Sequence, residues 1–429
     1  MFADRRRRVL DSIRGAAIVV AAPVSIRNND VEQEYRQDSD MQYLTGFDEP
    51  ESVLVLSKVH PEHRSVLFVR PRDREREQWD GARAGVEGAV AAYGLDAAFP
   101  LSELRKRLPE YLAGAEELVY ELGKSSEVDA HVLSAITQLR ARGRSVKPWP
   151  RTIIHPDSVW HELRLVKDAH ELERMRRAAT ISSDAHRAAM AVAAPGRFEY
   201  EVDATLREVF RRNGALREAY APIVGSGPNA TVLHYRENRR QMQDGELLLI
   251  DAGCEFDYYA ADITRTFPVN GTFSAAQRAV YEAVLTSQLA AIDEVRPGST
   301  IERVHEVALR VLVEGMVRVG LLVGAVDDLI AKESYKRFYM HRTSHWLGMD
   351  VHDVGSYFVG GVARPFVPGV VLTIEPGIYV SPDDVEAPAE FRGIGIRIED
   401  DVLVTADGHE VLSAAAPKTV DDIERACRT

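Results

Sequence analysis

Residues 246–267 read Glu-Leu-Leu-Leu-Ile-Asp-Ala-Gly-Cys-Glu-Phe-Asp-Tyr-Tyr-Ala-Ala-Asp-Ile-Thr-Arg-Thr-Phe, a pattern that predicts two strands joined by a turn. If Phe256 and Asp257 form a two-residue turn, counting outward from it places Asp251 opposite Asp262. Directly opposed residues have Cβ atoms about 4.5 to 5.5 Å apart, and like charges there are destabilising. We therefore expect a cation between these two carboxylates.

Three more side chains of metal-ligand type follow in strand-like or glycine-rich stretches, namely His345, Glu375 and Glu399. Each has an ordinary explanation when taken alone. Glu375 would be the exposed end of a strand that stops at Pro-Gly, and His345 would be a hydrogen-bonded core histidine. Glu399 alternates with Arg397 on one face of a strand, so a surface ion pair would explain it. Together with the aspartate pair, however, they favour one dinuclear metal site.

Four carboxylates and one imidazole form a hard, oxygen-rich ligand set, which suits Mn²⁺ or Mg²⁺, with Zn²⁺, Fe²⁺ and Co²⁺ as alternatives. Two such ions about 3.5 to 4 Å apart hold a hydroxide and polarise a carbonyl, which is machinery for hydrolysis. Competing motifs fail: His341 and His345 have the spacing of a zinc-protease helix, but Arg342 stands where that motif needs glutamate. The chain also lacks a Gly-x-Ser-x-Gly elbow, so we expect water as the nucleophile.

Composition limits the partners and the compartment. The formal net charge is -13, which argues against nucleic acid or anionic membrane as a partner. Two cysteines give no disulfide framework and suit a reducing compartment. No apolar run approaches the roughly 18 residues that span a membrane. A basic stretch and an apolar run near residues 5–23 imitate a signal peptide, but Asp11 and Arg14 interrupt them. A basic helix before a buried strand explains this segment better, and we expect a cytoplasmic protein.

The first part of the chain alternates apolar runs with helical stretches, which predicts an α/β domain over residues 1–160. The expected strands are 16–22, 52–56, 65–69 and 117–120. A proline-bearing stretch, Lys147-Pro-Trp-Pro-Arg-Thr-Ile-Ile-His-Pro156, then indicates a connection, with the boundary near 150 to 165.

Residues 161–429 contain an internal repeat. A capping box, Asp168 with Glu171 and later Ser274 with Gln277, opens a helix in each copy. Each helix is expected to end at Pro-Gly, at 195–196 and 297–298, so the period is 297 minus 195, or 102 residues. Second helices follow at 200–213 and 301–319. The repeat predicts an α+β domain in which a curved antiparallel sheet is covered by two pseudo-twofold-related helix pairs, with the ligands divided between the halves.

Several motifs make the chain resemble the aminopeptidase P family of pita-bread metallopeptidases, which also include prolidase and methionine aminopeptidase. The motifs of the second domain are residues 249–255, 261–270, 344–355, 373–377 and 393–400. The stretch Tyr35-Arg-Gln-Asp-Ser-Asp-Met-Gln-Tyr-Leu-Thr-Gly-Phe47 is similar to the creatinase-type N-terminal domain of aminopeptidase P and prolidase. The resemblance runs almost from end to end.

The resemblance implies that Asp251, Asp262, His345, Glu375 and Glu399 bind two divalent ions, commonly manganese. Asp262 and Glu399 would bridge the ions, with a hydroxide between them that attacks the scissile carbonyl. Glu375 would also carry the proton, His352 would stabilise the tetrahedral intermediate, and His234 would assist catalysis. By itself His234 is as readily a core or loop histidine.

Substrate contacts are implied for His341, Tyr379 and Arg397. Trp79 resembles a tryptophan that reaches the active site of a neighbouring subunit, which implies a homo-oligomer, a dimer or tetramer. The alternative is that Trp79 anchors its own domain.

The activity implied is that of a Xaa-Pro aminopeptidase, which releases the residue that precedes proline at the N-terminus of a peptide. The X-Pro bond has no N–H and a fixed φ near -65°, so a general aminopeptidase site would reject it. A prolidase-type dipeptidase is the first alternative, and a non-catalytic pita-bread module that binds peptides or histones is a remote one. Arg342 departs from relatives that often carry glycine there, which affects the rim of the pocket.

Overall fold

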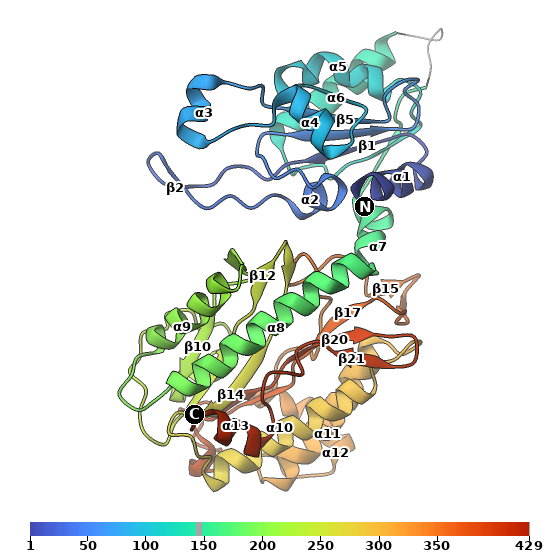
Figure 1. Cartoon of the computed structure of the whole chain (residues 1–429). Coiled ribbons are helices and arrows are strands. Elements are labelled where there is room, and N and C mark those ends of the chain that lie inside the picture. The colour runs from blue at the N-terminus through green and yellow to red at the C-terminus, as the bar shows by residue number, and fades with distance from the viewer. Residues whose placement is uncertain (143–147, 429) are drawn as a thin grey trace. The chain divides into compact units, whose positions relative to one another are not determined.

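The computed structural model describes residues 1–142 and 148–428. The chain forms two compact units, Met1–Leu163 and Arg164–Thr429 (Figure 1). Lys147, the first residue of the predicted connection, lies outside the described residues.

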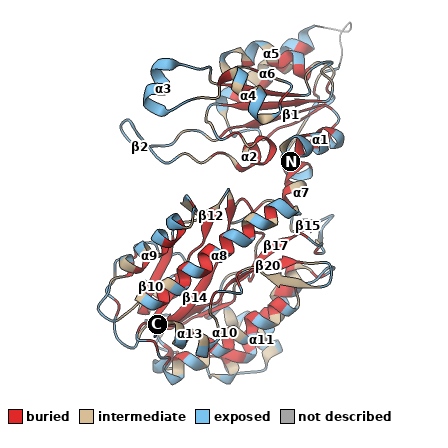
Figure 2. Cartoon of the chain, viewed as in Figure 1, coloured by how far each residue is buried: buried red, intermediate tan, exposed pale blue. Residues whose placement is uncertain are grey.

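The first unit is built on a six-stranded sheet with the order β6-β5-β4-β1-β7-β8. The central strands β1 and β4 are apolar and buried along their whole length, as expected for strands that are covered on both faces (Figure 2). The four predicted strands are confirmed, and β6 and β8 add an edge on each side. The bounds are β1 Ala16–Val20, β4 Val53–Ser57, β5 Ser65–Val69, β6 Ala97–Pro100, β7 Glu117–Val119 and β8 Thr152–Ile154.

Helices surround this sheet, and α1, Phe2–Ser12, leads directly into the buried strand β1, as the sequence predicted. A short exposed hairpin, β2 Ile26–Asn28 with β3 Val31–Glu32, was not predicted. The other helices are α2 Ser39–Thr45, α3 Arg74–Asp80, α4 Gly85–Tyr93, α5 Leu104–Leu112, α6 Ser126–Ala141 and α7 Trp160–Leu165.

Two helix pairs form the outer layer of the second unit, and both predicted capping boxes are present at their starts. In the first pair α8 packs on α9 and on β12, while in the second α10 packs on α11 and on β17 to β19 (Figure 1). The repeat is therefore confirmed, although α8 and α10 end a few residues before Pro-Gly. The bounds are α8 Ala169–Val192, α9 Glu199–Arg212, α10 Ala275–Asp293, α11 Ile301–Arg318, α12 Val326–Ala331 and α13 Val420–Ala426.

The strands of the second unit form small adjoining sheets, chiefly β10-β11-β14 from the first half and β17-β20-β21 from the second. The Glu399 backbone N–H donates to the Thr264 carbonyl at 3.0 Å and so joins the two halves. The first-half strands are β9 Arg217–Glu218, β10 Ile223–Ser226, β11 Leu247–Asp251, β12 Cys254–Phe256, β13 Tyr259–Ala260 and β14 Thr264–Pro268. Those of the second half are β15 Phe358–Val359, β16 Val362–Ala363, β17 Val371–Ile374, β18 Gly377–Tyr379, β19 Gly395–Arg397, β20 Asp400–Val404 and β21 His409–Val411.

The predicted register of the hairpin around residue 257 is wrong. Asp251 pairs with Thr264, not with Asp262, because Asp257 and Tyr258 form the turn. Both have positive φ, 48° and 70°, as a type I′ hairpin turn requires. Because the turn lies one residue later than predicted, each residue of the first strand pairs with a residue two positions further along the second strand. Asp262 therefore keeps the predicted face, but it lies diagonal to Asp251 rather than opposite it.

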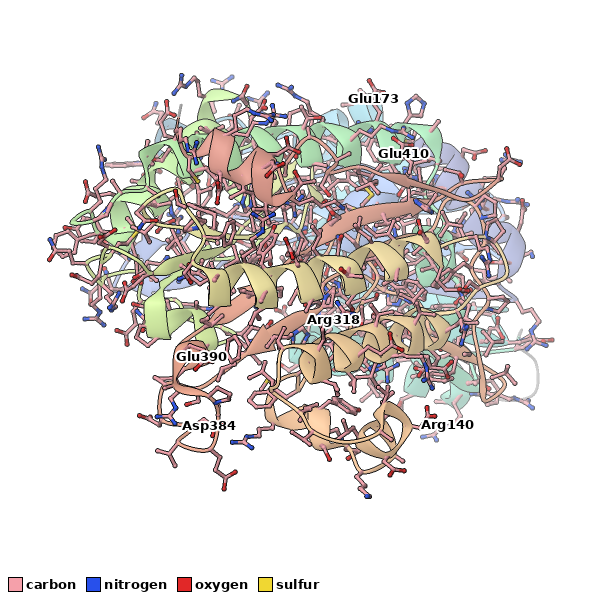
Figure 3. All side chains as sticks on the ribbon, turned by 90° about the horizontal axis from the view of Figure 1, so that it is seen from below. Arg140, Glu173, Arg318, Asp384, Glu390 and Glu410 are labelled. Carbon is pink, nitrogen blue, oxygen red and sulfur yellow. The ribbon has the colours of Figure 1, made fainter. Side chains whose placement is uncertain are left out.

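Glu173, Arg318 and Glu390, which are labelled in Figure 3, are exposed charged residues of the second unit. Among residues 1–142 and 148–428, no helix combines the length and the apolar character needed to cross a membrane. The two cysteines are free thiols, and Cys254 is buried.

Candidate metal centre

All five predicted metal ligands line one cavity of about 790 Å³ in the second unit. Each comes from a strand end or from a loop next to a strand. Asp251 ends β11, Asp262 precedes β14, Glu375 follows β17, and Glu399 lies between β19 and β20, while His345 comes from the loop before β17.

His345 is oriented as a metal ligand would be. Its Nδ1–H donates to the Trp346 carbonyl at 3.0 Å, so Nε2 is the ring nitrogen that faces the carboxylates of the cavity. Nε2 lies 3.4 Å from Asp262 Oδ2 and 3.7 Å from Glu375 Oε1. Two atoms that each bind the same ion at roughly 2.1 Å lie about 3 to 4 Å apart, so these separations fit shared coordination. Asp262, His345 and Glu399 also offer ligand atoms that all lie within 4.8 Å of one another.

Tyr220 joins the two aspartates in a way that the sequence did not reveal. Its hydroxyl oxygen lies 2.5 Å from Asp251 Oδ1 and 2.5 Å from Asp262 Oδ1. One hydroxyl proton serves only one of these oxygens at a time. The cluster therefore has more acceptor atoms than protons, which is the donor chemistry that a cation complements.

Arg397 is a buried cation that the chain itself supplies to this cluster. Its guanidinium donates to Asp251 Oδ2 at 2.6 Å, to the Tyr379 hydroxyl at 3.0 Å and to Thr264 Oγ1 at 3.0 Å. Thr264 in turn donates to Glu399 Oε2 at 2.7 Å. Arg397 and Glu399 are 3% and 2% exposed, so the alternative of a surface ion pair is wrong.

The remaining polar partners hold His341 in its neutral form. The Tyr379 hydroxyl lies 2.9 Å from His341 Nε2, while His341 Nδ1–H donates to the Arg342 carbonyl at 2.8 Å. Burial lowers the pKa of His341 to about 4. Tyr379 thus touches His341 and Arg397 at once and positions both side chains at the cavity wall.

The carboxylates titrate differently because burial and neighbouring charges act on each of them differently. Burial raises the pKa of Glu375 to about 7, and it raises that of Glu399 well above its ordinary value. Burial also raises the pKa of Asp251, although the Arg397 charge opposes this. At Asp262 burial acts in the same direction, but the hydrogen bond and charge of His345, together with Tyr220 and Arg397, outweigh it and the pKa falls. The site is therefore richer in negative donors than its own cations can neutralise, and divalent ions fit it.

Two other predicted catalytic residues line the same cavity. The ring of His352 lies 4.4 Å from that of His345, edge to face, and burial lowers the pKa of His352. His234 also lines the cavity, beside Leu233. The structure thus brings His234, His341, His352 and Arg397 together with the five predicted ligands.

Trp79 lies in α3 of the first unit and is 82% exposed. The alternative that it anchors its own domain is wrong, because its ring packs on little of that domain. Its predicted contact with a neighbouring subunit stays a prediction.

Residues that were not predicted also form hydrogen bonds with the metal-ligand residues, among them Thr264, Asp401 and Tyr220. Thr264 follows Asp262 by two positions and so lies on the same face of the strand. The alternation of side chains along a strand would therefore have predicted Thr264 as a site residue. Asp401 accepts a hydrogen bond from the Asp262 backbone N–H at 3.1 Å and fixes that segment. Tyr220 carries no local signal, because it lies far along the chain from both of its partners.

Comparison with known proteins agrees with this geometry. The model of Metallopeptidase family M24 matches residues 173–406, and that of the aminopeptidase P N-terminal domain matches residues 2–120. The chain is 45% identical to the Xaa-Pro aminopeptidase of Escherichia coli (strain K12), over 99% of this chain and 96% of the relative. It is 40% identical to the Xaa-Pro aminopeptidase of Haemophilus influenzae, with the same coverage of 99% and 96%.

Solved structures show the same likeness. Pseudomonas aeruginosa aminopeptidase PepP superimposes with a TM-score of 0.96 at 50% identity, covering 100% of this chain and 97% of that one. Zinc-substituted E. coli aminopeptidase P in complex with product gives a TM-score of 0.95 at 44% identity, again covering 100% and 97%. The likeness therefore includes both units.

Proposed function

The chain belongs to metallopeptidase family M24 and carries an aminopeptidase P N-terminal domain, and on this basis we propose that it is a metal-dependent Xaa-Pro aminopeptidase. It releases the N-terminal residue from peptides that have proline in the second position. The observation that carries the proposal is the convergence of five metal-ligand side chains on one cavity of about 790 Å³. The relatives from Escherichia coli and Haemophilus influenzae, which each align with 99% of this chain, are both named Xaa-Pro aminopeptidase.

Asp251, Asp262, His345, Glu375 and Glu399 are the residues that would hold two divalent ions. Bound ions of this kind polarise a carbonyl and supply a nucleophilic water at neutral pH. The four carboxylates favour Mn²⁺, with Zn²⁺, Co²⁺ and Fe²⁺ as alternatives.

Glu375 is the proton carrier of this proposal. The Glu375 carboxylate lies in the cavity wall, with its Oε1 3.7 Å from His345 Nε2, where it would take a proton from water and pass it on to the leaving nitrogen. The leaving proline nitrogen needs a proton because breaking the C–N bond would otherwise expel an amide anion. His352 would donate a hydrogen bond to the carbonyl oxygen as that oxygen becomes negative, and its position 4.4 Å from the ring of His345 supports this role.

The proline ring would contact the histidine and aromatic part of the cavity. His234, His341, Tyr357 and Phe358 line the cavity and supply four rings for such a contact. At the rim Arg342 forms an ion pair with Glu302. We assign the acceptance of proline to the ring-lined wall and the tolerance for longer peptides to this rim pair.

Peptide length separates the proposal from the dipeptidase alternative. Purified protein is assayed with X-Pro dipeptides, X-Pro-Y tripeptides and X-Ala-Y tripeptides of matched sequence. We expect cleavage of X-Pro-Y and little cleavage of X-Ala-Y. Hydrolysis confined to the dipeptides would reject the aminopeptidase.

Metal dependence separates the enzyme from a binding module. Chelated protein should lose activity, and separate titrations with Mn²⁺, Zn²⁺, Co²⁺ and Fe²⁺ should show which ion restores it. The matched variant Asp262→Asn keeps the side-chain shape but weakens one ligand, so we expect it to fold normally and to remain inactive with every ion. Peptide binding without turnover under all these conditions would favour the non-catalytic module.

Location and assembly are further parts of the proposal: a cytoplasmic homo-oligomer, dimer or tetramer, in which Trp79 reaches a partner's active site. Two free cysteines suit a reducing compartment. Because Trp79 is 82% exposed, Trp79→Ala should change the free energy of unfolding by no more than about 0.5 kcal/mol. A loss of activity in that variant, with sedimentation showing an oligomer, would support the contact, whereas unchanged kinetics would remove it.

A further inference from the structure

A second cluster of metal-ligand side chains lies in the first unit and takes no part in the proposed reaction. It consists of His155, Asp157 and His161. His155 follows β8, Asp157 belongs to a single 3-10 turn that Pro156 begins, and His161 is in the first turn of α7. The tight turn between strand and helix brings the three side chains together within seven residues of sequence.

Asp157 lies between the two imidazoles. Its Oδ1 is 3.0 Å from His155 Nδ1 and 2.8 Å from His161 Nδ1. The two imidazole rings are 5.7 Å apart and nearly perpendicular, at 73°. One ligand atom from each of the three residues lies within 4.8 Å of the others. An ion that binds each atom at roughly 2.0 to 2.2 Å needs only small side-chain rotations to be accommodated.

The other face of His161 supplies an independent observation. His161 Nε2 lies 3.0 Å from Asp40 Oδ2, and both side chains are buried, at 8% and 6% exposed. A carboxylate beside one ring nitrogen takes that N–H and directs the lone pair of the other nitrogen outward. With Nε2 as the donor to Asp40, Nδ1 faces Asp157 Oδ1 at 2.8 Å, where a metal ion would take the place of a shared proton. Histidines that bind metals are commonly held by a carboxylate in this manner.

We propose that His155, Asp157 and His161 bind one Zn²⁺ ion, with Asp40 orienting His161 from behind. Two imidazoles and one carboxylate are a ligand set that zinc accepts, with water in the fourth position. The set is poorer in oxygen than the four carboxylates of the cavity, so it favours Zn²⁺ over Mn²⁺. The ion would tie the loop after β8 to α7 and, through Asp40, to α2 within the same unit.

The test compares the number of zinc ions bound per chain in full-length variants, because the catalytic cavity also takes up metal. His155→Gln and Asp157→Asn alter side chains that are 51% and 69% exposed, so both variants should fold like the wild type. His131→Gln is the matched control, since His131 faces Glu127 at 3.7 Å in the same unit but has no third ligand within the described chain. Each protein is stripped with chelator, dialysed against Zn²⁺ and measured by elemental analysis and titration calorimetry.

We expect the wild type and His131→Gln to bind one zinc ion more than His155→Gln and Asp157→Asn. We also expect all four proteins to have equal activity after reconstitution with Mn²⁺. The melting temperature of the wild type should rise with Zn²⁺ more than that of His155→Gln. Equal zinc counts in all four proteins would overturn the proposal and leave His161 as a histidine that is hydrogen-bonded between two aspartates. An equal loss in His131→Gln would overturn it too, because the extra zinc would then be bound by histidines in general.

Discussion

Replacing Tyr220 by phenylalanine should weaken metal binding while leaving the fold intact. The hydroxyl lies 2.5 Å from one oxygen of Asp251 and 2.5 Å from one oxygen of Asp262, and phenylalanine keeps the ring. Burial, together with these carboxylates, raises the pKa of Tyr220 well above its usual value, so the hydroxyl keeps its proton at every working pH. The substitution therefore removes one hydrogen-bond donor from the two ligands and nothing else.

The size of the effect follows from two estimates that agree. A hydrogen bond to a charged group contributes about 1.5 to 3 kcal/mol. Loss of a group that orients a metal ligand typically costs about 10- to 100-fold in affinity or activity, or about 1.4 to 2.8 kcal/mol. We therefore expect the Mn²⁺ concentration for half-maximal activity to rise about 10- to 100-fold.

The assay is hydrolysis of an X-Pro-Y tripeptide by chelated enzyme titrated with Mn²⁺. Excess Mn²⁺ should restore a large part of the activity, because the five ligands themselves are unchanged. Tyr281→Phe is the matched control: its buried hydroxyl donates to the Lys418 carbonyl at 2.7 Å, and it does not line the cavity. That variant should lose some stability without a change in the Mn²⁺ midpoint.

Two results would refute this reasoning. A Mn²⁺ midpoint within about twofold of the wild type would mean that Asp251 and Asp262 do not depend on Tyr220. The same shift in Tyr281→Phe would mean that general destabilisation, and not the hydroxyl at the ligands, causes the effect.

Three further predictions concern the hairpin, a buried histidine and the rim. In Gly253→Ala the new Cβ would lie 1.7 Å from the Ala261 carbonyl oxygen, so the hairpin between the two aspartates must move. We expect the free energy of unfolding to fall by about 1 to 3 kcal/mol and kcat to fall markedly. A wild-type kcat would contradict this prediction. Burial lowers the pKa of His186 from 6.5 to about 4, so the folded state is stabilised above pH 6.5 and loses about 3 kcal/mol from this group as the pH falls through 4. Denaturant unfolding between pH 7 and pH 4 should therefore show a smaller loss in His186→Gln, and parallel curves would count against the assignment. Arg342→Ala removes the ion pair with Glu302 and opens the rim of the cavity. The KM for longer X-Pro peptides should therefore fall relative to the KM for tripeptides, while kcat stays nearly unchanged. An unchanged ratio of the two KM values would show that the rim does not select peptide length.

Local patterns predicted a large part of the fold. The capping boxes at Asp168 and Ser274 were predicted because the residues that form them are three apart, and a helix start is a local event. The strands at 16–20 and 53–57 were predicted because strands covered on both faces are continuously apolar.

The hairpin register was not predicted correctly, since it depends on which residues adopt positive φ. Moving the turn from 256–257 to Asp257 and Tyr258 changes every pair along the hairpin by two. The pattern of polar and apolar residues is the same in both registers, because side chains alternate with a period of two. The pattern thus predicted the face of each aspartate but not its partner.

The sequence by itself determined the type and order of the ligands, together with the strands and helices that carry them. This was possible because charge and hydrophobic periodicity are properties of each segment alone. Tertiary structure decided which atoms meet. It placed Tyr220 between Asp251 and Asp262, and it buried Arg397 against them from the far end of the chain. It also set the pKa of Glu375 near 7, since burial depends on the segments packed around the carboxylate. Distances and desolvation arise only when separate segments pack together, and the chemistry of this site depends on both.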